Sequence, residues 1–326
     1  MITAWQSELK ATVNDPTQLF KLLALSEDFL PAAQQAVKLF PLRVTQSFIA
    51  RMRKGDPQDP LLNQVLPLGA EMLEVPGFSQ DPLAESQHNP VPGLLHKYQG
   101  RVLLTVTGGC AIHCRYCFRR HFPYHKNTVG RKNWSQFLHY IAADDSIREV
   151  ILSGGDPLVA DDHHLSELIT QLAMIPQLQI LRIHSRLPIV LPQRINAELI
   201  QALTRTRLRP VMVIHCNHAQ EIDETVAKAL QMLVSSNITV LNQTVLLKTI
   251  NDSLSALENL SYRLFNCHVL PYYLHLLDKV QGAAHFEVPM ETAKKLYWQL
   301  RQRLPGYLVP TLVQEMPGAT SKLPIL

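Results

Sequence analysis

From about residue 100 onward, the chain alternates between short apolar runs rich in β-branched residues and longer stretches whose apolar positions recur every three or four residues. The short runs are typical of buried strands, and they lie at residues 102–107, 149–153, 180–184, 211–215, 239–247 and 268–274. The longer stretches predict helices that bury one face, at residues 133–143, 163–175, 197–204, 221–235 and 254–265. This alternation predicts a parallel sheet with helical crossovers, either curved into a barrel or open and doubly wound.

The first 95 residues follow a different pattern. Asp15 followed by Pro16 is typical of a helix start, and two more short helices are predicted at residues 31–40 and 44–53. Asp-Pro and Asn-Pro pairs, which favour turns, dominate the stretch that follows. We expect a helical extension with a wrapping segment, then a β/α unit, then a C-terminal segment, at residues 1–95, 96–290 and 291–326.

The first predicted strand leads through two glycines into a loop that holds three of the chain's five cysteines. They form the motif C-x3-C-x2-C, at Cys110, Cys114 and Cys117. Three thiolates can bind three irons of a 4Fe–4S cluster, and the fourth iron then stays open for a ligand. Two alternatives remain: a zinc site with His113 or His121 as the fourth ligand, and three thiols without a metal.

Basic residues are concentrated beside this loop, although the formal net charge is only +4 over 326 residues. The set consists of Arg115, Arg119, Arg120, Lys126, Arg131 and Lys132. It forms a nucleic-acid patch or a solvated face, or it supplies counter-charges for anionic ligands and a reduced cluster. We favour the last, because a nucleic-acid footprint usually makes the whole domain basic, and we expect no nucleic-acid partner.

The composition is that of an ordinary globular enzyme, with 46% hydrophobic and 18% charged residues. The sequence contains no apolar run of about 18 residues and no signal-peptide pattern at its start. Clustered thiols without such a signal indicate a reducing environment. We therefore expect a cytoplasmic protein with no membrane partner.

Polar and small residues accompany other predicted strands. The second strand ends in Ser153-Gly154-Gly155-Asp156, where two glycines would let the backbone approach a ligand closely, although many strand–turn junctions share this pattern. Arg182 ends the third strand, and Gln243 lies inside the fifth. Polar groups in buried strands need partners, which are either other buried side chains or the nucleoside of a bound ligand.

The last apolar run, at residues 307–314, leads into a loop of small residues that contains Lys322. A lysine in such a place is usually a solvated side chain. A lysine after a strand, in a flexible loop, can also form a Schiff base with pyridoxal phosphate (PLP). These residues by themselves favour the first interpretation.

The cysteine loop at the end of the first predicted strand resembles the signature of the radical S-adenosylmethionine (SAM) enzymes. Further segments are similar to the lysine 2,3-aminomutase family, which combines a radical SAM cluster with PLP, and they are residues 153–157, 182–194, 241–252 and 317–322. Residues 43–52, 91–98, 117–124 and 272–286 look like the EpmB branch of that family, which serves β-lysylation of elongation factor P. The resemblance covers nearly the whole chain.

The resemblance implies a fold of the α/β class, a partial (β/α)6 TIM-like radical SAM barrel with an N-terminal helical extension. It implies that the three cysteines hold the cluster and that Lys322 forms the Schiff base. Arg119 would bind the substrate carboxylate, and Asp252 and Glu315 its ε-ammonium group, with Glu315 standing where the family has aspartate. SAM would contact Ser153, Gly154, Gly155, Asp156, Arg182 and Gln243. The PLP phosphate would lie near Arg101 and Lys97.

The implied activity is that of an isomerase that converts L-α-lysine to (R)-β-lysine with a 4Fe–4S cluster, SAM and PLP. The implied partners are L-lysine, an electron donor such as flavodoxin and, through the product, elongation factor P and its lysyl ligase. The larger aminomutases of the family continue past the PLP lysine into an assembly-forming tail, whereas this sequence has four residues after Lys322. We therefore expect a monomer or a dimer. The alternatives are a PLP-independent radical SAM enzyme that modifies RNA or protein, and a non-enzymatic iron–sulfur or zinc sensor.

Overall fold

Nine strands form one sheet in which spatial order follows chain order. The structure, a computed structural model, describes residues 3–128, 130 and 134–325. The strands are β1 (Leu94–Tyr98), β2 (Arg101–Thr107), β3 (Glu149–Gly154), β4 (Ile180–Ser185), β5 (Arg209–His215), β6 (Thr239–Val245), β7 (Leu270–His275), β8 (Thr311–Gln314) and β9 (Leu323–Pro324). Neighbours from β2 to β8 pair in parallel, whereas β1 and β9 pair antiparallel at the two edges.

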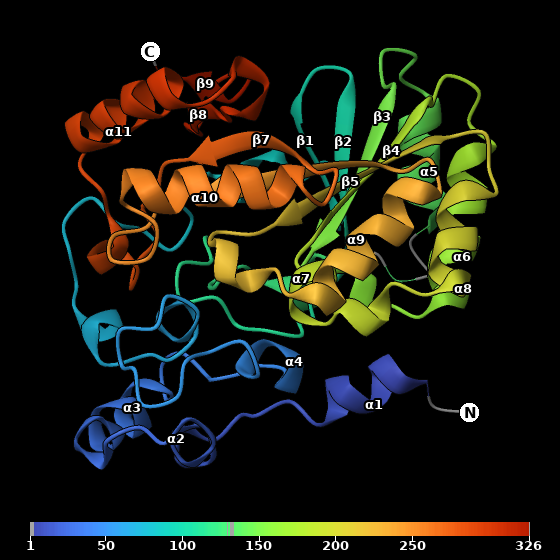
Figure 1. The fold of residues 1–326 in the computed structure, drawn as a ribbon. Helices are drawn as coiled ribbons and strands as arrows, with labels where there is room; N and C mark the ends of the chain where they lie inside the picture. The colour runs from blue at the N-terminus through green and yellow to red at the C-terminus, as the bar shows by residue number, and fades with distance from the viewer. Residues whose placement is uncertain (1–2, 129, 131–133, 326) are drawn as a thin grey trace.

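A helix follows each parallel strand from β2 to β7 (Figure 1). These helices are α5 (Trp134–Ala142), α6 (Asp162–Ala173), α8 (Ala197–Thr204), α9 (Glu224–Ser235), α10 (Leu254–Phe265) and α11 (Met290–Arg303), and a short α7 (Leu187–Val190) precedes α8. Side chains cap several helix starts: Asp161 accepts a hydrogen bond from the backbone of His164, and Asn196 accepts one from Leu199. Each capped helix then buries an apolar stripe, such as Leu165, Leu168, Ile169 and Leu172 of α6.

The strand order distinguishes the two architectures that the sequence allows. In a doubly wound sheet the order reverses at one strand, whereas here it runs from β1 to β9 without reversal. Right-handed crossovers in one direction place every helix on the same face of the sheet, so the sheet curves around its other face. The result is the predicted partial (β/α)6 barrel, and the predicted fold class is confirmed.

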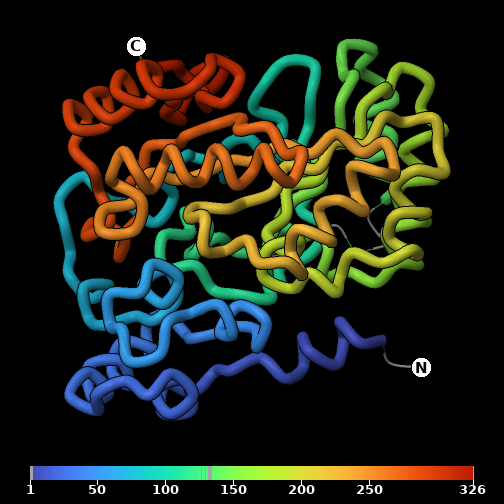
Figure 2. The backbone as a smooth tube through the Cα atoms, viewed as in Figure 1, coloured from blue at the N-terminus to red at the C-terminus, as the bar shows by residue number. Residues whose placement is uncertain are grey.

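The N-terminal extension packs at one end of the barrel, as Figures 1 and 2 show in blue. Its helices are α1 (Ala4–Lys10), α2 (Pro16–Leu23), α3 (Leu30–Ala36) and α4 (Gln46–Ile49). Arg51 donates to the carbonyl of Ile189 at 2.7 Å, and the guanidinium of Arg194 lies 4.4 Å from the ring of Trp5. Because these contacts reach the segment that follows β4, the extension covers the end of the barrel at which the parallel strands terminate.

Single-turn 3-10 helices form the remaining helical segments: η1 (Glu27–Phe29), η2 (Leu62–Gln64), η3 (Ala70–Met72), η4 (Glu85–His88), η5 (Tyr124–Lys126), η7 (Pro157–Val159), η8 (Pro192–Arg194), η9 (Ala219–Glu221), η10 (Ala284–Phe286) and η11 (Gly306–Leu308). The extension and the barrel share one hydrophobic core cluster, which includes Leu19, Phe48 and Leu104. The three-part division of the chain therefore stays a prediction, since no separate core marks its first boundary.

The predicted elements agree with the structure within a few residues, with definite exceptions. The six predicted strands correspond to β2 to β7. The short strands β1 and β9 and the helices α1 and α11 were not predicted. Residues 131–133, which include two members of the predicted basic set and the predicted start of α5, lie outside the described residues. No helix among the described residues is long and apolar enough to cross a membrane.

Candidate active site

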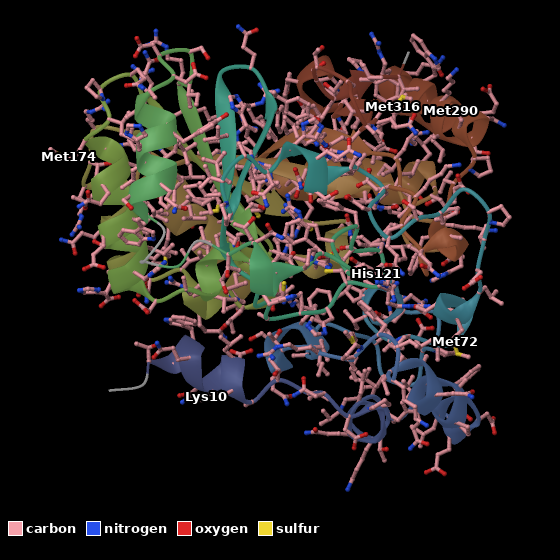
Figure 3. The ribbon with its side chains drawn as sticks, turned by 180° about the vertical axis from the view of Figure 1, so that it is seen from behind. Lys10, Met72, His121, Met174, Met290 and Met316 are labelled. Carbon is pink, nitrogen blue, oxygen red and sulfur yellow. The ribbon has the colours of Figure 1, made fainter. Side chains whose placement is uncertain are left out.

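A cavity of about 510 Å³ lies where the parallel strands end. Every site residue predicted from the sequence lines it except Asp252. The lining includes the three cysteines, the turn after β3, and charged residues from β1, β2, β4 and the loop after β8. His121, an exposed lining residue, lies where the barrel meets the N-terminal extension (Figure 3), so the cavity reaches the surface on that side.

The cysteine loop and the turn after β3 are packed backbone against backbone. The amide of Asp156 donates to the carbonyl of Gly109 at 2.8 Å, and that of Gly155 donates to Thr107 at 2.7 Å. A Cβ atom at Gly155 would lie 2.4 Å from the carbonyl oxygen of Gly109, closer than any real contact. Gly155 therefore allows the two protein loops to pack closely, whereas the sequence suggested that the glycines allow a ligand to come close.

The three thiols are free and partly accessible from the cavity. Burial raises the pKa of Cys117 to about 11 and also raises the pKa of Cys110. Without a metal, Cys110 and Cys117 are neutral thiols, and metal binding would displace their protons. Cysteines of this kind fit a metal centre that supplies enough positive charge to stabilise three thiolates.

The described side chains fit a cluster better than a single zinc ion. Among residues 3–128, 130 and 134–325, no group of three His, Cys, Asp or Glu side chains is arranged to hold one metal ion. Thiolates on a 4Fe–4S cluster each bind a different iron and need not converge on one point. The two candidate fourth zinc ligands face backbone carbonyls, His113 at Pro41 (2.8 Å) and His121 at Gln281 (3.4 Å).

Asp156, a predicted SAM contact, is buried in a network of protein donors. Its carboxylate accepts hydrogen bonds from the Ser185 hydroxyl at 2.7 Å and from the Arg186 amide at 2.7 Å. Burial raises the pKa of Asp156 to about 6, although these donors oppose the shift. The carboxylate ties the turn after β3 to the end of β4, which explains its position without a ligand.

Two other predicted SAM contacts are held by neighbouring strands. Arg182 on β4 donates to both carboxylate oxygens of Glu149 on β3, at 2.9 and 2.5 Å. Gln243 on β6 contacts the Nε2 atom of His215 on β5 at 2.7 Å. Burial lowers the pKa of His215 to about 3, so this imidazole is neutral. Buried polar groups of the barrel interior thus satisfy one another while still lining the cavity.

Lys322 is held opposite a carboxylate by strand pairing. Val313 pairs with Pro324 and Gln314 with Leu323 in the antiparallel ladder of β8 and β9. Continued by one residue, this register sets Glu315 opposite Lys322, and the Lys322 ammonium lies 2.5 Å from a Glu315 oxygen. The short β9 strand therefore fixes the amine in the cavity wall.

Glu315 is shared by two lysines and a tyrosine. Lys97 lies 2.8 Å from its Oε1 atom, and the Tyr98 hydroxyl donates to the same atom at 3.0 Å. Burial opposes ionisation of Glu315, but Lys322 and Lys97 outweigh that effect and hold its pKa well below the usual range. The group is a permanent anion placed among cations.

Each nitrogen of the Arg119 guanidinium donates to a protein partner. Its Nε and Nη2 atoms donate to the two carboxylate oxygens of Glu85 at 2.8 and 2.7 Å. Its Nη1 atom donates to the Ser153 hydroxyl at 3.0 Å. Burial would lower the pKa of Arg119, but Glu85 overrides this and raises it above the ordinary value. Glu85 comes from η4, 34 residues away along the chain, and no sequence pattern indicates this pairing.

The chain is similar to known proteins over nearly its whole length. A family model described as a 4Fe-4S single cluster domain matches residues 99–181. The L-lysine 2,3-aminomutase of Escherichia coli (strain K12) is 52% identical over 98% of this chain and 94% of its own length. The L-lysine 2,3-aminomutase of Haemophilus influenzae is also 52% identical, over the same shares of the two chains. The chain belongs to the L-lysine 2,3-aminomutase family. The resemblance predicted from the motifs is confirmed, and it extends to the enzyme of that name from Clostridium subterminale, 34% identical over 99% of this chain and 77% of that one.

For a chain of the lysine 2,3-aminomutase family, the position of Asp252 is unexpected. This residue does not line the cavity. Its carboxylate instead accepts a hydrogen bond from the Thr249 amide at 3.0 Å, closing a turn after β6 in which Thr249 has a left-handed φ of 66°. Turn-closing aspartates are common for this reason, and the structure does not bring Asp252 together with the other predicted site residues.

Asp278, three residues beyond β7, is an acidic residue that lines the cavity and was not predicted as a site residue. Burial, and after it the nearby Glu315 carboxylate, raises the pKa of Asp278 to about 7. A polar residue just after the carboxyl end of a barrel strand is a general signal for a site residue. Asp278 carries this signal, because it follows the last residue of β7 by three positions.

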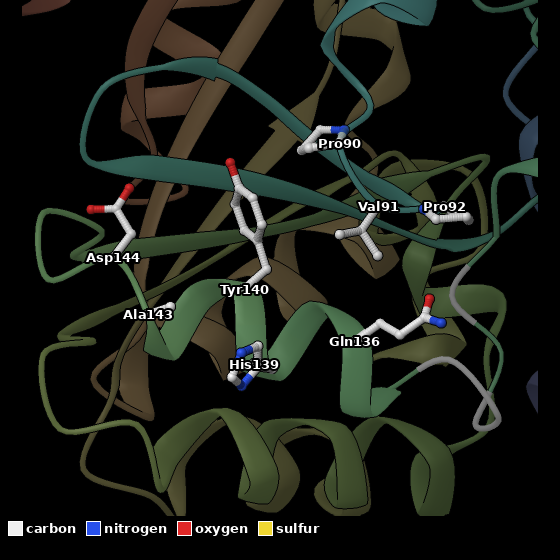
Figure 4. Close-up of a pocket in the computed structure, with 8 residues that line it drawn as sticks. All are labelled: Pro90, Val91, Pro92, Gln136, His139, Tyr140, Ala143 and Asp144. Atoms are coloured by element: carbon white, nitrogen blue, oxygen red, sulfur yellow. The ribbon is translucent and has the colours of Figure 1, made fainter.

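A second cavity, of about 670 Å³, lies outside the barrel between the segment entering β1 and helix α5 (Figure 4). Its lining includes Pro90, Val91, Tyr140 and Asp144. It shares no lining residue with the cavity at the strand ends. None of the site residues predicted from the sequence lines this second cavity.

Proposed function

We propose that this protein is a radical SAM, PLP-dependent lysine 2,3-aminomutase that converts L-α-lysine to (R)-β-lysine. One observation carries the proposal: the three cysteines and Lys322 line the same cavity. Near-identical length and 52% identity to enzymes named for this reaction support it. They favour it over a PLP-independent modifying enzyme and over a sensor.

The residues present fit the cofactors that this activity needs. When bound, the cluster and SAM supply the radical chemistry, and PLP activates the substrate amino group. Cys110, Cys114 and Cys117 would hold the cluster. Lys322 would hold PLP, and Arg101 and Lys97, both lining the cavity, would balance the phosphate charge. The turn after β3, with Arg182 and Gln243, would border SAM.

Arg119 would bind the substrate carboxylate. Glu85 holds the Nε and Nη2 side of the guanidinium, so a ligand would approach the second Nη2 hydrogen and Nη1. Nη1 donates to the rotatable Ser153 hydroxyl at 3.0 Å and, at 3.4 Å, to the Gly154 carbonyl. Charge-assisted hydrogen bonds of this type contribute about 1.5–3 kcal/mol each. Since a lysine within a protein has no free carboxylate, this contact favours free lysine as the working substrate.

Glu315 and Asp278 would receive the distant ammonium group, in place of the predicted pair of Glu315 and Asp252. Glu315 is ionised in the free protein, whereas the raised pKa of Asp278, about 7, leaves it partly protonated near neutral pH. A cation placed between them would favour the ionised form of Asp278. Substrate binding would therefore be coupled to release of a proton from this carboxyl group.

The experiment is anaerobic reconstitution with iron and sulfide, followed by incubation with SAM, PLP, a reductant and either free lysine or unmodified elongation factor P. We expect chiral product analysis to detect (R)-β-lysine from the free amino acid. Formation of β-lysine only within the protein substrate would contradict the role given to Arg119. Absence of β-lysine from both, with an intact cluster, would contradict the proposed function.

The partners, the oligomeric state and the cellular location of the protein are also proposals. The product would serve elongation factor P through its lysyl ligase, and an electron donor such as flavodoxin would reduce the cluster. A monomer or dimer in a reducing cytoplasm is the expected form. Addition of the ligase and elongation factor P to the assay above would reveal the linkage as β-lysyl attachment detected by mass spectrometry.

A further inference from the structure

We propose that Arg186 sets the reduction potential of the cluster by donating a hydrogen bond to one of its cysteine ligands. The Nη1 atom of Arg186 lies 2.7 Å from the sulfur of Cys114. The inference rests on the cluster assigned under the proposed function, but not on the identity of the substrate. It concerns the side chain of Arg186, to which the proposed function assigns no role.

The position of Arg186 is fixed at its backbone and along its side chain. Its amide donates to the Asp156 carboxylate at 2.7 Å. Its Nη2 atom donates to Gln64 at 2.6 Å and to Glu221 at 3.1 Å. The side chain is 5% exposed, and the guanidinium lies 5.4 Å from the ring of Phe48. A side chain held at both ends cannot swing away from the sulfur without breaking several buried contacts.

Glu221 balances the charge of Arg186 and pairs with its Nη2 atom, whereas the sulfur of Cys114 lies at Nη1. Its other carboxylate oxygen accepts hydrogen bonds from the amides of Asn217 and His218, at 2.9 and 3.1 Å, and from the Gln64 side chain at 3.0 Å. These donors satisfy the carboxylate of Glu221, which is fully buried. The pair is neutral as a whole, with its positive end directed at the sulfur.

This orientation predicts the direction of the effect. Reduction of a 4Fe–4S cluster adds one electron, and part of the added charge falls on the cysteine sulfurs. A buried donor on such a sulfur stabilises the reduced state more than the oxidised state, which raises the reduction potential. Arg186 therefore makes the cluster easier to reduce by a given electron donor.

The test is a redox titration of the reconstituted protein, with the reduced cluster measured by electron paramagnetic resonance. The variant is Arg186→Met with Glu221→Gln, which removes the donor and leaves no unpaired buried charge. We expect its midpoint potential to shift to a more negative value. Arg186→Lys, which keeps the charge but shortens the side chain, should shift it less. An unchanged midpoint potential in the double variant would overturn the proposal.

Arg120→Gln is the control that removes a nearby positive charge without removing a hydrogen bond to a cysteine sulfur. Arg120 belongs to the same loop region, but it donates to the carbonyls of Arg115 and Gly282 rather than to a sulfur. We expect a smaller shift in this variant than in the double variant. Equal shifts would show that nearby charge, not the hydrogen bond, sets the potential.

A measurement on the wild-type protein keeps the proposal testable if the variants do not bind the cluster. Protein labelled with ¹⁵N in the arginine guanidinium groups should show a nitrogen coupling to the reduced cluster in pulsed electron paramagnetic resonance. No such coupling would contradict the hydrogen bond directly. Because neither measurement uses lysine, both outcomes are independent of whether the protein proves to be an aminomutase.

Discussion

The two cofactor-binding parts of the cavity are built in different ways. The cysteine part comes from one contiguous loop, shaped by backbone contacts to the neighbouring glycine turn. The lysine part is assembled from separate segments, since Lys97 comes from β1, Glu315 from the end of β8 and Lys322 from the residue before β9. A local motif is visible in the sequence, whereas a constellation of this second kind depends on the tertiary structure.

The largest effect should come from breaking the cysteine part. Cys117→Ser should abolish stable cluster binding and with it all aminomutase activity, because a thiolate ligand to iron is lost. PLP binding through Lys322 should persist if the two parts are independent. Iron and sulfide analysis together with the visible spectrum after addition of PLP measures both. Loss of PLP binding in the same variant would mean that the parts fold as one.

The reciprocal change should break the lysine part alone. Lys322→Ala should remove the visible absorbance band of lysine-bound PLP and abolish product formation, because the amine that holds the cofactor is gone. Iron content should remain at the wild-type level. Lys279→Ala is the control, since that exposed lysine pairs with Glu287 at the surface. A retained PLP band in Lys322→Ala would assign the cofactor to another lysine.

A smaller effect should distinguish the two candidate aspartates. Asp278→Asn should raise KM for lysine by about 10- to 100-fold, the equivalent of about 1.5–3 kcal/mol for one charge-assisted hydrogen bond. Asp252→Asn should leave KM nearly unchanged, because that side chain closes a turn away from the cavity. Steady-state kinetics on both variants gives the answer. The opposite result would restore the residue predicted from the sequence.

The smallest effect expected is a pH dependence of lysine binding. The pKa of Asp278 is raised to about 7 in the free protein, and the ammonium group of lysine favours its ionised form. Affinity for lysine should therefore increase as the pH rises through about 7 and then level off. The same raised pKa makes a contribution to stability that is full below about 4, the ordinary pKa of aspartate, and is lost as the pH rises from there through about 7. Asp278→Asn should have a flat binding profile in this range, which titration at several pH values would measure.

The sequence predicts the barrel well because its elements have strong local signals. Apolar runs with β-branched residues identify β2 to β7, and caps such as Asn196 and Ser253 start helices at the predicted residues. The strand β1 escapes prediction because it is partly polar, and β9 because it has only two residues; both pair at the edges of the sheet. The sequence also leaves open whether the sheet is a barrel or an open sheet, and only the observed strand order distinguishes the two.

Most of the candidate site residues can be predicted from the sequence, but their hydrogen-bond partners cannot. The cysteines and Lys322 are predicted from motifs and resemblance. The partners of Arg119 and Arg182 lie about 34 and 33 residues away along the chain, at distances where periodicity carries no information. Asp252 and Asp278 both follow strands, and only the direction of each loop decides which carboxylate enters the cavity.

The position of the Lys322 amine depends on the register in which β8 pairs with β9. Side chains on a strand alternate between the two faces, and neighbouring residues are about 3.3 Å apart along it. Deleting or inserting a single residue in the loop between Glu315 and Lys322 would turn the amine to the opposite face, even with every cavity residue intact. In this loop, length is therefore under a stricter constraint than composition.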